Sequence, residues 1–249
     1  VTVLYNTPDG TNINDRCGST HPKMLQAAVV ENGAEVGLAF DGDADRLIAV
    51  DEHGQLVDGD QIMLVCALDM KKKGTLTQDT VVTTVMSNMG LDLALKKAGC
   101  PYVKTQVGDR YVLEEMRKNG YSLGGEQSGH VIFLDHNTTG DGILTALKLV
   151  GVMRHSGKTL SELAAQMEKL PQVLINAKVH NGARDTYMEN AEIAKAIKQI
   201  EKDFHGEGRV LIRPSGTEPL VRVMIEGRDQ AVIEEKAVAL ANLIESKLG

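Results

Sequence analysis

The sequence predicts a multidomain α/β protein that ends in a small α+β domain. Short apolar runs rich in β-branched residues alternate with helix-like segments over the first two-thirds of the chain. Glycines stand where many of these helices should end. Pro171 then marks a boundary, beyond which the order is strand, helix, strand, strand, helix. The chain has 249 residues, enough for about one to three domains, and we expect boundaries near residues 56 and 169.

The first part should hold one helix and a pair of strands. We expect an opening strand at Val1–Tyr5, followed by a polar stretch rich in turn residues. The hydroxyls and proline of Ser19-Thr20-His21-Pro22 are typical of a helix start, and this helix should end at Gly33. Two apolar runs follow, Val36–Phe40 and Leu47–Val50, which predict strands because turn residues bound both.

The same kinds of apolar segment and of bounding residue predict the remaining helices and strands. The expected helices are Gln61–Lys73, Met89–Ala98, Arg110–Asn119, Asp141–His155, Thr159–Lys169, Asn190–Phe204 and Asp229–Leu248. The expected strands are Val81–Met86, Tyr102–Val107, Val131–Leu134, Val173–His180, Arg209–Arg213 and Leu220–Glu226. Asp58 or Asp60 should cap the first of these helices, and Asp109 the third.

Composition limits the possible partners. The net charge is −7, which argues against a general binder of nucleic acid or acidic membranes, because such proteins need an excess of Lys and Arg. Cys17, Cys66 and Cys100 have no zinc spacing and are odd in number, so we expect reduced, buried thiols in a cytoplasmic protein. The chain begins without Met inside a strand-like run, and we interpret it as part of a longer protein.

The most informative segment is the metal loop, Asp41-Gly42-Asp43-Ala44-Asp45-Arg46. Three carboxylates at alternate positions repel one another unless a cation joins them, and hard oxygen ligands suit Mg²⁺ or Ca²⁺. Arg46 beside such a metal is suited to phosphate, which metal and guanidinium would bind together. The loop therefore predicts a metal site for phosphoryl transfer.

Two other interpretations of the metal loop stay open. Acidic residues at positions one, three, five and twelve match much of an EF-hand calcium loop. Arg46 stands where the EF-hand needs glycine, however, and the flanking segments predict strands rather than helices. The other possibility is a solvated acidic turn without a metal.

A second candidate is the sugar loop, Gly124-Gly125-Glu126-Gln127-Ser128-Gly129-His130. Its glycines allow close backbone approach to a ligand. Glu126 and Ser128 are suited to hydrogen bonds with sugar hydroxyls or an amino group, and His130 could transfer a proton or contact a phosphate. The alternative is a glycine-rich turn that only precedes a strand.

A third candidate is the phosphate turn, Arg213-Pro214-Ser215-Gly216-Thr217-Glu218-Pro219. Backbone N–H groups around Gly216 could surround an anion, Ser215 and Thr217 add hydroxyls, and Arg213 and Arg222 add guanidinium groups. The alternative is an ordinary hairpin turn. A weaker candidate is Asp109-Arg110, where Arg110 could face a ligand or Asp109 could only cap its helix.

In this order and separation the three loops resemble the α-D-phosphohexomutase superfamily, and the resemblance covers essentially the whole chain. It implies that Asp41, Asp43 and Asp45 bind Mg²⁺, that Arg46, His130 and Asp109 act in catalysis, and that the following residues bind substrate: Glu126, Ser128, His130, Arg110, Arg213, Ser215, Gly216, Thr217 and Arg222. It also implies that residues 1–56 belong to a second α/β domain, residues 57–169 form a third, and residues 170–249 form a C-terminal phosphate-binding domain. Ala44 replaces a more usual glycine, a change that we expect to leave coordination intact.

The resemblance also implies a reaction. Gln127 in the sugar loop resembles the superfamily branch that interconverts glucosamine 6-phosphate and glucosamine 1-phosphate for cell-wall precursors, whereas glucose and mannose phosphate mutases more often carry Met there. The superfamily's phosphoserine loop, of the Ser-His-Asn-Pro type, does not occur in this sequence, so we expect the chain alone to be inactive. A homodimer of the longer protein and a non-enzymatic module that binds metal or phosphosugar both stay open.

Overall fold

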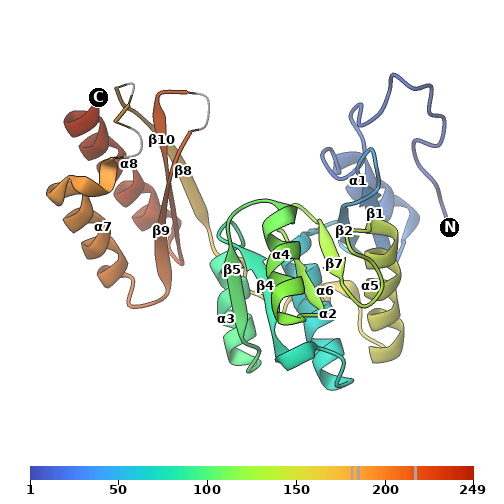
Figure 1. Ribbon diagram of the computed structural model, residues 1–249. Helices are drawn as coiled ribbons and strands as arrows, with labels where there is room; N and C mark the ends of the chain where they lie inside the picture. Colours follow the sequence, from blue (N-terminus) through green and yellow to red (C-terminus); the bar gives the residue numbers. More distant parts are fainter. Residues whose placement is uncertain (181, 184–185, 216–217) are drawn as a thin grey trace. The chain divides into compact units, whose positions relative to one another are not determined.

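The computed structural model describes residues 1–180, 182–183, 186–215 and 218–249. These residues form two compact units, unit 1 (Val1–Glu168) and unit 2 (Lys169–Gly249), each with its own sheets and helices (Figure 1). The α/β class with an α+β C-terminal part is confirmed. The division of unit 1 near residue 56 stays a prediction.

The N-terminal part of unit 1 is a three-stranded antiparallel sheet with one helix. Strands β1 (Val36–Phe40), β2 (Leu47–Asp51) and β3 (Leu56–Val57) lie in the order β1-β2-β3. Phe40 pairs with Leu47, so residues 41–46 form the loop of a hairpin. Helix α1 (Lys23–Asn32) packs against this hairpin and ends at Gly33, which adopts the left-handed conformation. Both predicted strands and the predicted helix end are confirmed.

Two expectations for the N-terminal segment are wrong. Residues 1–5 form no strand, because they lie exposed and pair with no other described strand; Figure 1 shows an irregular chain (dark blue) before α1. The N-cap of α1 is Pro22, without a side-chain cap, and the hydroxyl of Thr20 shares a hydrogen bond with His21 Nδ1 instead.

The second sheet of unit 1 has four strands in the order β5-β4-β6-β7. Its members are β4 (Val81–Thr84), β5 (Tyr102–Thr105), β6 (Leu123–Gly125) and β7 (Val131–Phe133). β4 is parallel to β5 and β6, whereas β7 is antiparallel to β6. The sequence did not predict β6, because glycines weaken a strand pattern. Gly124 leaves room there for the Met116 side chain, since a Cβ atom would lie 2.7 Å from Met116 Sδ.

Five helices accompany this sheet. They are α2 (Gly59–Lys72), α3 (Met89–Lys97), α4 (Asp109–Asn119), α5 (Gly142–Ser156) and α6 (Leu160–Ala164). Asp58 is the N-cap of α2 and forms a capping box with Gln61. Asp109 is not a cap: Gly108 occupies that position, and Asp109 is the first helical residue. Helix α6 ends at Ala164, earlier than predicted.

One core joins the two parts of unit 1. It includes Leu47 from β2, Met63 from α2 and Leu149 from α5, none of which is exposed to solvent. The hairpin that carries the metal loop therefore packs on the helices that follow it. Cys66 lies in the same core, where burial raises the pKa of its thiol to about 12. All three cysteines are free, as predicted, although Cys17 is only half-buried.

Unit 2 is an antiparallel sheet covered by two helices. Strands β8 (Gln172–Lys178), β9 (Gly208–Pro214) and β10 (Leu220–Gly227) lie in the order β8-β10-β9. Alternate residues of β10 enter the core with side chains of α7 (Ala191–Asp203) and α8 (Gln230–Leu248). Asn190 and Asp229 cap these helices. No helix among the described residues is long and apolar enough to cross a membrane.

Candidate functional site

The metal loop brings its three carboxylates together. One oxygen from each of Asp41, Asp43 and Asp45 lies within 4.8 Å of the others. The turn closes through the Asp41 carbonyl, which accepts a hydrogen bond from the Ala44 N–H at 3.1 Å. Ala44 adopts a φ of 59°, a left-handed conformation that alanine rarely takes. Three hard oxygens at this spacing fit a divalent cation such as Mg²⁺.

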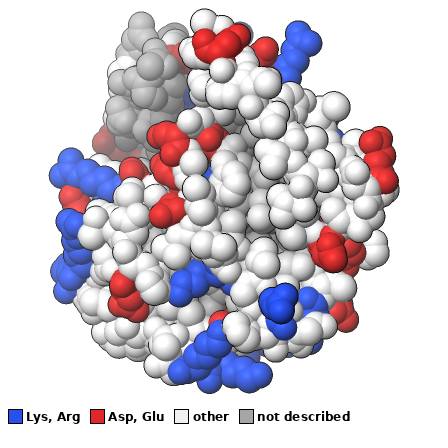
Figure 2. Space-filling model, turned by 90° about the vertical axis from the view of Figure 1, so that its right-hand side faces the viewer, with Lys and Arg blue, Asp and Glu red and all other residues white. Residues whose placement is uncertain are grey.

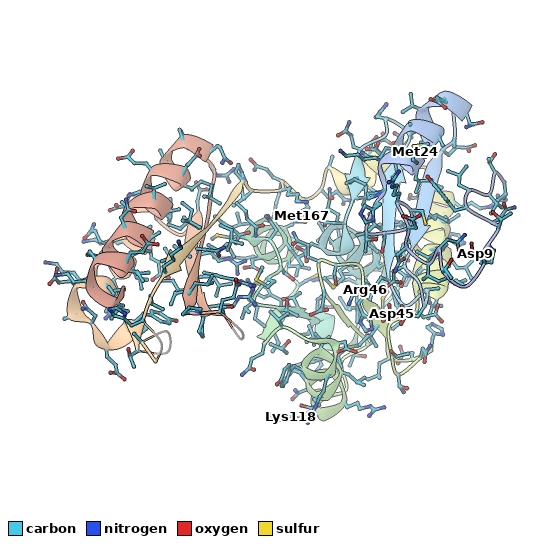
Figure 3. The ribbon with its side chains drawn as sticks, turned by 90° about the horizontal axis from the view of Figure 1, so that it is seen from above. Asp9, Met24, Asp45, Arg46, Lys118 and Met167 are labelled. Atoms are coloured by element: carbon cyan, nitrogen blue, oxygen red, sulfur yellow. The ribbon has the colours of Figure 1, made fainter. Side chains whose placement is uncertain are left out.

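Arg46 lies beside this cluster. Its Nε is 3.7 Å from Asp41 Oδ2 and 3.9 Å from Asp45 Oδ1, and its backbone N–H donates to Asp41 Oδ1. Figure 3 shows Arg46 and Asp45 next to one another in unit 1. The Arg46 side chain is 42% exposed, so its guanidinium is accessible to an anion. Arg46 and the acidic cluster therefore lie together in one loop.

The sugar loop is joined to the metal loop through the backbone. The Leu47 N–H donates to the Gly129 carbonyl at 3.0 Å, and Arg46 and His130 form an antiparallel bridge. Within the sugar loop, the Glu126 N–H donates to the His130 carbonyl and the Gly129 N–H to the Glu126 carbonyl. The two loops are therefore parts of a single structure rather than separate turns.

Helices α2 and α5 begin at these loops. The first residue of α2, Gly59, donates its N–H to the Gln127 carbonyl of the sugar loop, and a Cβ there would lie 2.2 Å from the Glu126 carbonyl. The first residue of α5, Gly142, donates its N–H to the Ala44 carbonyl of the metal loop, and a Cβ would lie 2.5 Å from the Arg46 carbonyl. The glycine-rich run Gly140-Asp141-Gly142 carries a signal that could have indicated this contact from sequence.

His130 is the most buried of the predicted site residues in unit 1. Its side chain is 3% exposed, and its Nε2 lies 3.4 Å from Asp45 Oδ2. Burial, then hydrogen bonding and charge repulsion from Asp41, raises the pKa of Asp45, and His130 opposes this shift. The surroundings thus disfavour a negative charge on Asp45. A bound cation would offset this effect, because it attracts the ionised carboxylates.

The other predicted side chains of unit 1 have different surroundings. Glu126 Oε1 accepts a hydrogen bond from the Gly108 N–H at 2.9 Å, so the sugar loop also contacts the start of α4. Ser128 is exposed. Asp109 is exposed too, and Arg110 donates to Glu114 one helical turn away, which raises the pKa of Arg110. The structure of unit 1 by itself therefore leaves Asp109 and Arg110 at the surface.

Unit 2 places Arg213 of the phosphate turn opposite Arg222, which follows the turn. Arg213 on β9 pairs with Arg222 on β10, so their side chains lie on the same face of the sheet. Asn176 on β8 continues this row and was not predicted. Ser215 is buried, and its hydroxyl accepts the Glu218 N–H at 3.3 Å. Gly216 and Thr217 lie outside the described residues, so their predicted role stays untested.

On the face shown in Figure 2, charged side chains of both signs are scattered around a largely uncharged middle. Anion binding would accordingly depend on local groups such as Arg46, Arg213 and Arg222.

Family models identify the class of protein. Residues 58–170 match the description "Phosphoglucomutase/phosphomannomutase, alpha/beta/alpha domain III", and residues 174–243 match the C-terminal domain of the same family. The chain belongs to the phosphoglucomutase/phosphomannomutase family. The resemblance deduced from the three loops is thereby confirmed.

Individual relatives show a more specific similarity than the family models do. The chain is 64% identical over 241 residues to phosphoglucosamine mutase of Thermoanaerobacter sp. (strain X514), covering 97% of this chain and 54% of the relative. It is 61% identical over 249 residues to phosphoglucosamine mutase of Acetivibrio thermocellus, covering 100% of this chain and 56% of the relative. The chain thus spans about half the length of the curated relatives it matches.

Solved structures agree on the fold. The crystal structure of Aspergillus fumigatus N-acetylphosphoglucosamine mutase, in complex with GlcNAc-6P and magnesium, matches with a TM-score of 0.75 at 23% identity. The match covers 95% of this chain and 54% of that chain.

Proposed function

We propose that this chain is part of an enzyme that interconverts glucosamine 6-phosphate and glucosamine 1-phosphate. The observation that carries the proposal is the convergence of Asp41, Asp43 and Asp45 beside Arg46, in a loop joined to the sugar loop. The 60–64% identity to phosphoglucosamine mutases supports this choice of substrate. Glutamine at position 127 supports it as well, because the resemblance associates Met there with glucose and mannose phosphates.

The chemistry is two phosphoryl transfers. A phosphoserine outside this sequence gives its phosphoryl group to the sugar's free hydroxyl: the serine P–O bond breaks, a sugar P–O bond forms, and a base takes the hydroxyl proton. The leaving serine oxygen takes up a proton. The resulting bisphosphate then returns its other phosphoryl group to the serine: the second sugar P–O bond breaks, the serine P–O bond forms again, and the proton of the serine hydroxyl passes to the sugar oxygen. Both steps build negative charge on the transferred group and on the oxygens that flank it.

The residues of this chain divide this work. Asp41, Asp43 and Asp45 hold Mg²⁺, which when bound supplies positive charge to the phosphoryl group in transfer. Arg46 adds a guanidinium beside it. Glu126 and Ser128 bind the sugar's amino and hydroxyl groups. The remaining assignments are Asp109 and His130 as acid–base groups, Arg110 as a substrate contact, and Arg213, Ser215, Gly216, Thr217 and Arg222 as ligands of the phosphate that is not transferred.

The proposal extends to the setting of the enzyme. We place it in the cytoplasm, as a phosphoprotein of amino-sugar metabolism that supplies peptidoglycan precursors, and leave open a homodimer of the longer protein. The 249-residue chain alone should not turn over glucosamine 6-phosphate with Mg²⁺, because it supplies no phosphoserine loop. Clear turnover by the pure chain would contradict this part.

Calorimetry of the chain with Mg²⁺, Ca²⁺ and glucosamine 1-phosphate tests the site itself. We expect Mg²⁺ binding and sugar-phosphate binding that Asp43→Asn and Arg46→Ala weaken. Strong Ca²⁺ preference without sugar-phosphate binding would favour a non-enzymatic metal module. In the longer enzyme, a preference for glucose or mannose phosphate would move the chain to the other branch of its family.

A further inference from the structure

His130 is held against the metal loop by a glycine that the sequence analysis did not single out. The Gly140 N–H donates a hydrogen bond to His130 Nε2 at 3.2 Å, and the same nitrogen lies 3.4 Å from Asp45 Oδ2. The imidazole therefore stands between the start of α5 and one carboxylate of the acidic cluster.

The fit between ring and glycine leaves no room for a side chain. A Cβ on Gly140 would lie 2.4 Å from both Cδ2 and Nε2 of His130 and 2.7 Å from Cε1. Gly140 has no positive φ, so this contact and not the backbone conformation requires glycine. Two residues later, Gly142 binds the Ala44 carbonyl, so one short segment supports both the imidazole and the metal loop.

The backbone of His130 is fixed as well. Its carbonyl accepts the Glu126 N–H at 2.9 Å, and the residue bridges to Arg46. Both ring nitrogens are removed from solvent: Nε2 accepts the Gly140 N–H, and Nδ1 is buried without a hydrogen-bond partner among the described residues. The buried ring therefore lies against Asp45.

We propose that His130 is a positioning residue for the metal loop: its imidazole, packed against Gly140, fills the space beside Asp45 and so confines the Asp45 carboxylate to the orientation that shares one cation with Asp41 and Asp43. This inference rests on the proposed magnesium site. It gives His130 an indirect role besides the proposed acid–base role, because the residue sets metal affinity through Asp45.

The test is Mn²⁺ binding to the 249-residue chain, measured from the free-ion signal in electron paramagnetic resonance, with Mg²⁺ as competitor. Loss of a group that orients a metal ligand lowers affinity about 10- to 100-fold, and we expect His130→Ala to fall in this range. His130→Gln keeps a polar group near Nε2 and should retain part of the affinity. His155→Ala, an exposed histidine on α5, should bind Mn²⁺ like the wild type.

Gly140→Ala supplies an independent variant, because its methyl group should push the ring away from Asp45 and weaken Mn²⁺ binding with His130 still present. In a His130→Ala background the same methyl group meets no ring, so the second substitution should add no further loss. Leu149→Ala controls for general destabilisation: it leaves a cavity in the unit 1 core but should not change Mn²⁺ affinity. Circular dichroism establishes that each variant is folded.

The outcomes separate the two proposals. Wild-type affinity in folded His130→Ala and Gly140→Ala chains, with normal Mn²⁺ binding by the wild type, would overturn the positioning role alone. Absence of saturable Mn²⁺ binding by the wild-type chain would overturn the metal site, and the positioning role with it.

Discussion

The candidate sites of unit 1 and unit 2 are built in different ways. In unit 1 the metal loop, the sugar loop and the first residues of α2 and α5 hydrogen-bond to one another through their backbones, and glycines occupy the closest contacts. In unit 2 the phosphate turn lies between two strands, and the strand register alone sets Arg213 opposite Arg222. Ligand binding in unit 1 should therefore depend mainly on the exact positions of the loops, whereas ligand binding in unit 2 should depend mainly on the positive charge of the two arginines.

This difference predicts two kinds of mutational effect. A small change in the hydrogen-bonded loops of unit 1 should alter both the stability of the fold and the geometry of the ligand site. The reason is that these loops are closely packed and displacing one of them displaces its neighbours. Removal of an arginine from unit 2 should weaken phosphate binding while the fold stays intact.

Gly129→Ala should lower the free energy of unfolding by about 2–4 kcal/mol. Gly129 has a φ of 96°, and a Cβ there would lie 2.2 Å from the Leu47 carbonyl, which belongs to the rigid β2 strand. Urea unfolding measures the effect. The matched control is Gly151→Ala in α5, where a Cβ meets no atom within 4 Å and alanine should stabilise the helix. Equal stabilities of the two variants would show that the loops are not interlocked.

Arg213→Ala should weaken glucosamine 1-phosphate binding by about 1–3 kcal/mol, because a charged hydrogen bond is lost. Titration calorimetry measures this, and urea unfolding should show little change in stability. Lys198→Ala removes an exposed positive charge from α7 and is the control for net charge. Unchanged affinity in Arg213→Ala would mean that the phosphate turn is only a hairpin.

Ser161→Ala should lower the free energy of unfolding at pH 7 by about 1 kcal/mol. The Ser161 hydroxyl and backbone N–H both donate to Glu52, far in sequence from the start of α6. Burial opposes the ionisation of Glu52, but hydrogen bonds from Ser161 and Thr159 outweigh it and lower the pKa from 4.5 to about 2.

The sign of the pH dependence follows from this depressed pKa. The stabilisation by ionised Glu52 is complete above pH 4.5, the value in the unfolded chain, and is lost as the pH falls toward about 2. The difference between wild type and Ser161→Ala should therefore be largest at pH 7 and smaller at pH 3 in urea unfolding. A difference that grows on acidification would exclude the hydrogen bonds to ionised Glu52 as its source.

Ala44→Gly should have the smallest effect, a gain of about 0.5 kcal/mol or less, because relief of the left-handed backbone is partly offset by the flexibility of glycine in the unfolded chain. The midpoint temperature of thermal unfolding should rise slightly, and the Mn²⁺ affinity should stay at the wild-type value. A marked loss of affinity would mean that the Ala44 methyl group helps to hold the metal loop in place.

The sequence predicted most elements because their signals are local. Short apolar runs bounded by turn residues predicted β1 and β2, and glycines predicted the ends of α1 and α4. Where a local signal needed a partner, prediction failed: Val1–Tyr5 has strand-like residues but no neighbouring strand among those described, and β6 is a strand only because β4 and β7 flank it.

The same division holds for the candidate site. Residue types at short, regular spacing were enough to indicate the acidic cluster beside Arg46 and the family of the chain. The folded chain was needed to show that Gly140 and Gly142 contact the metal-loop region and that His130 faces Asp45. It was also needed to show that Asp109 lies exposed at the start of its helix. Those contacts join residues distant in the chain, and their geometry depends on packing that local sequence patterns do not encode.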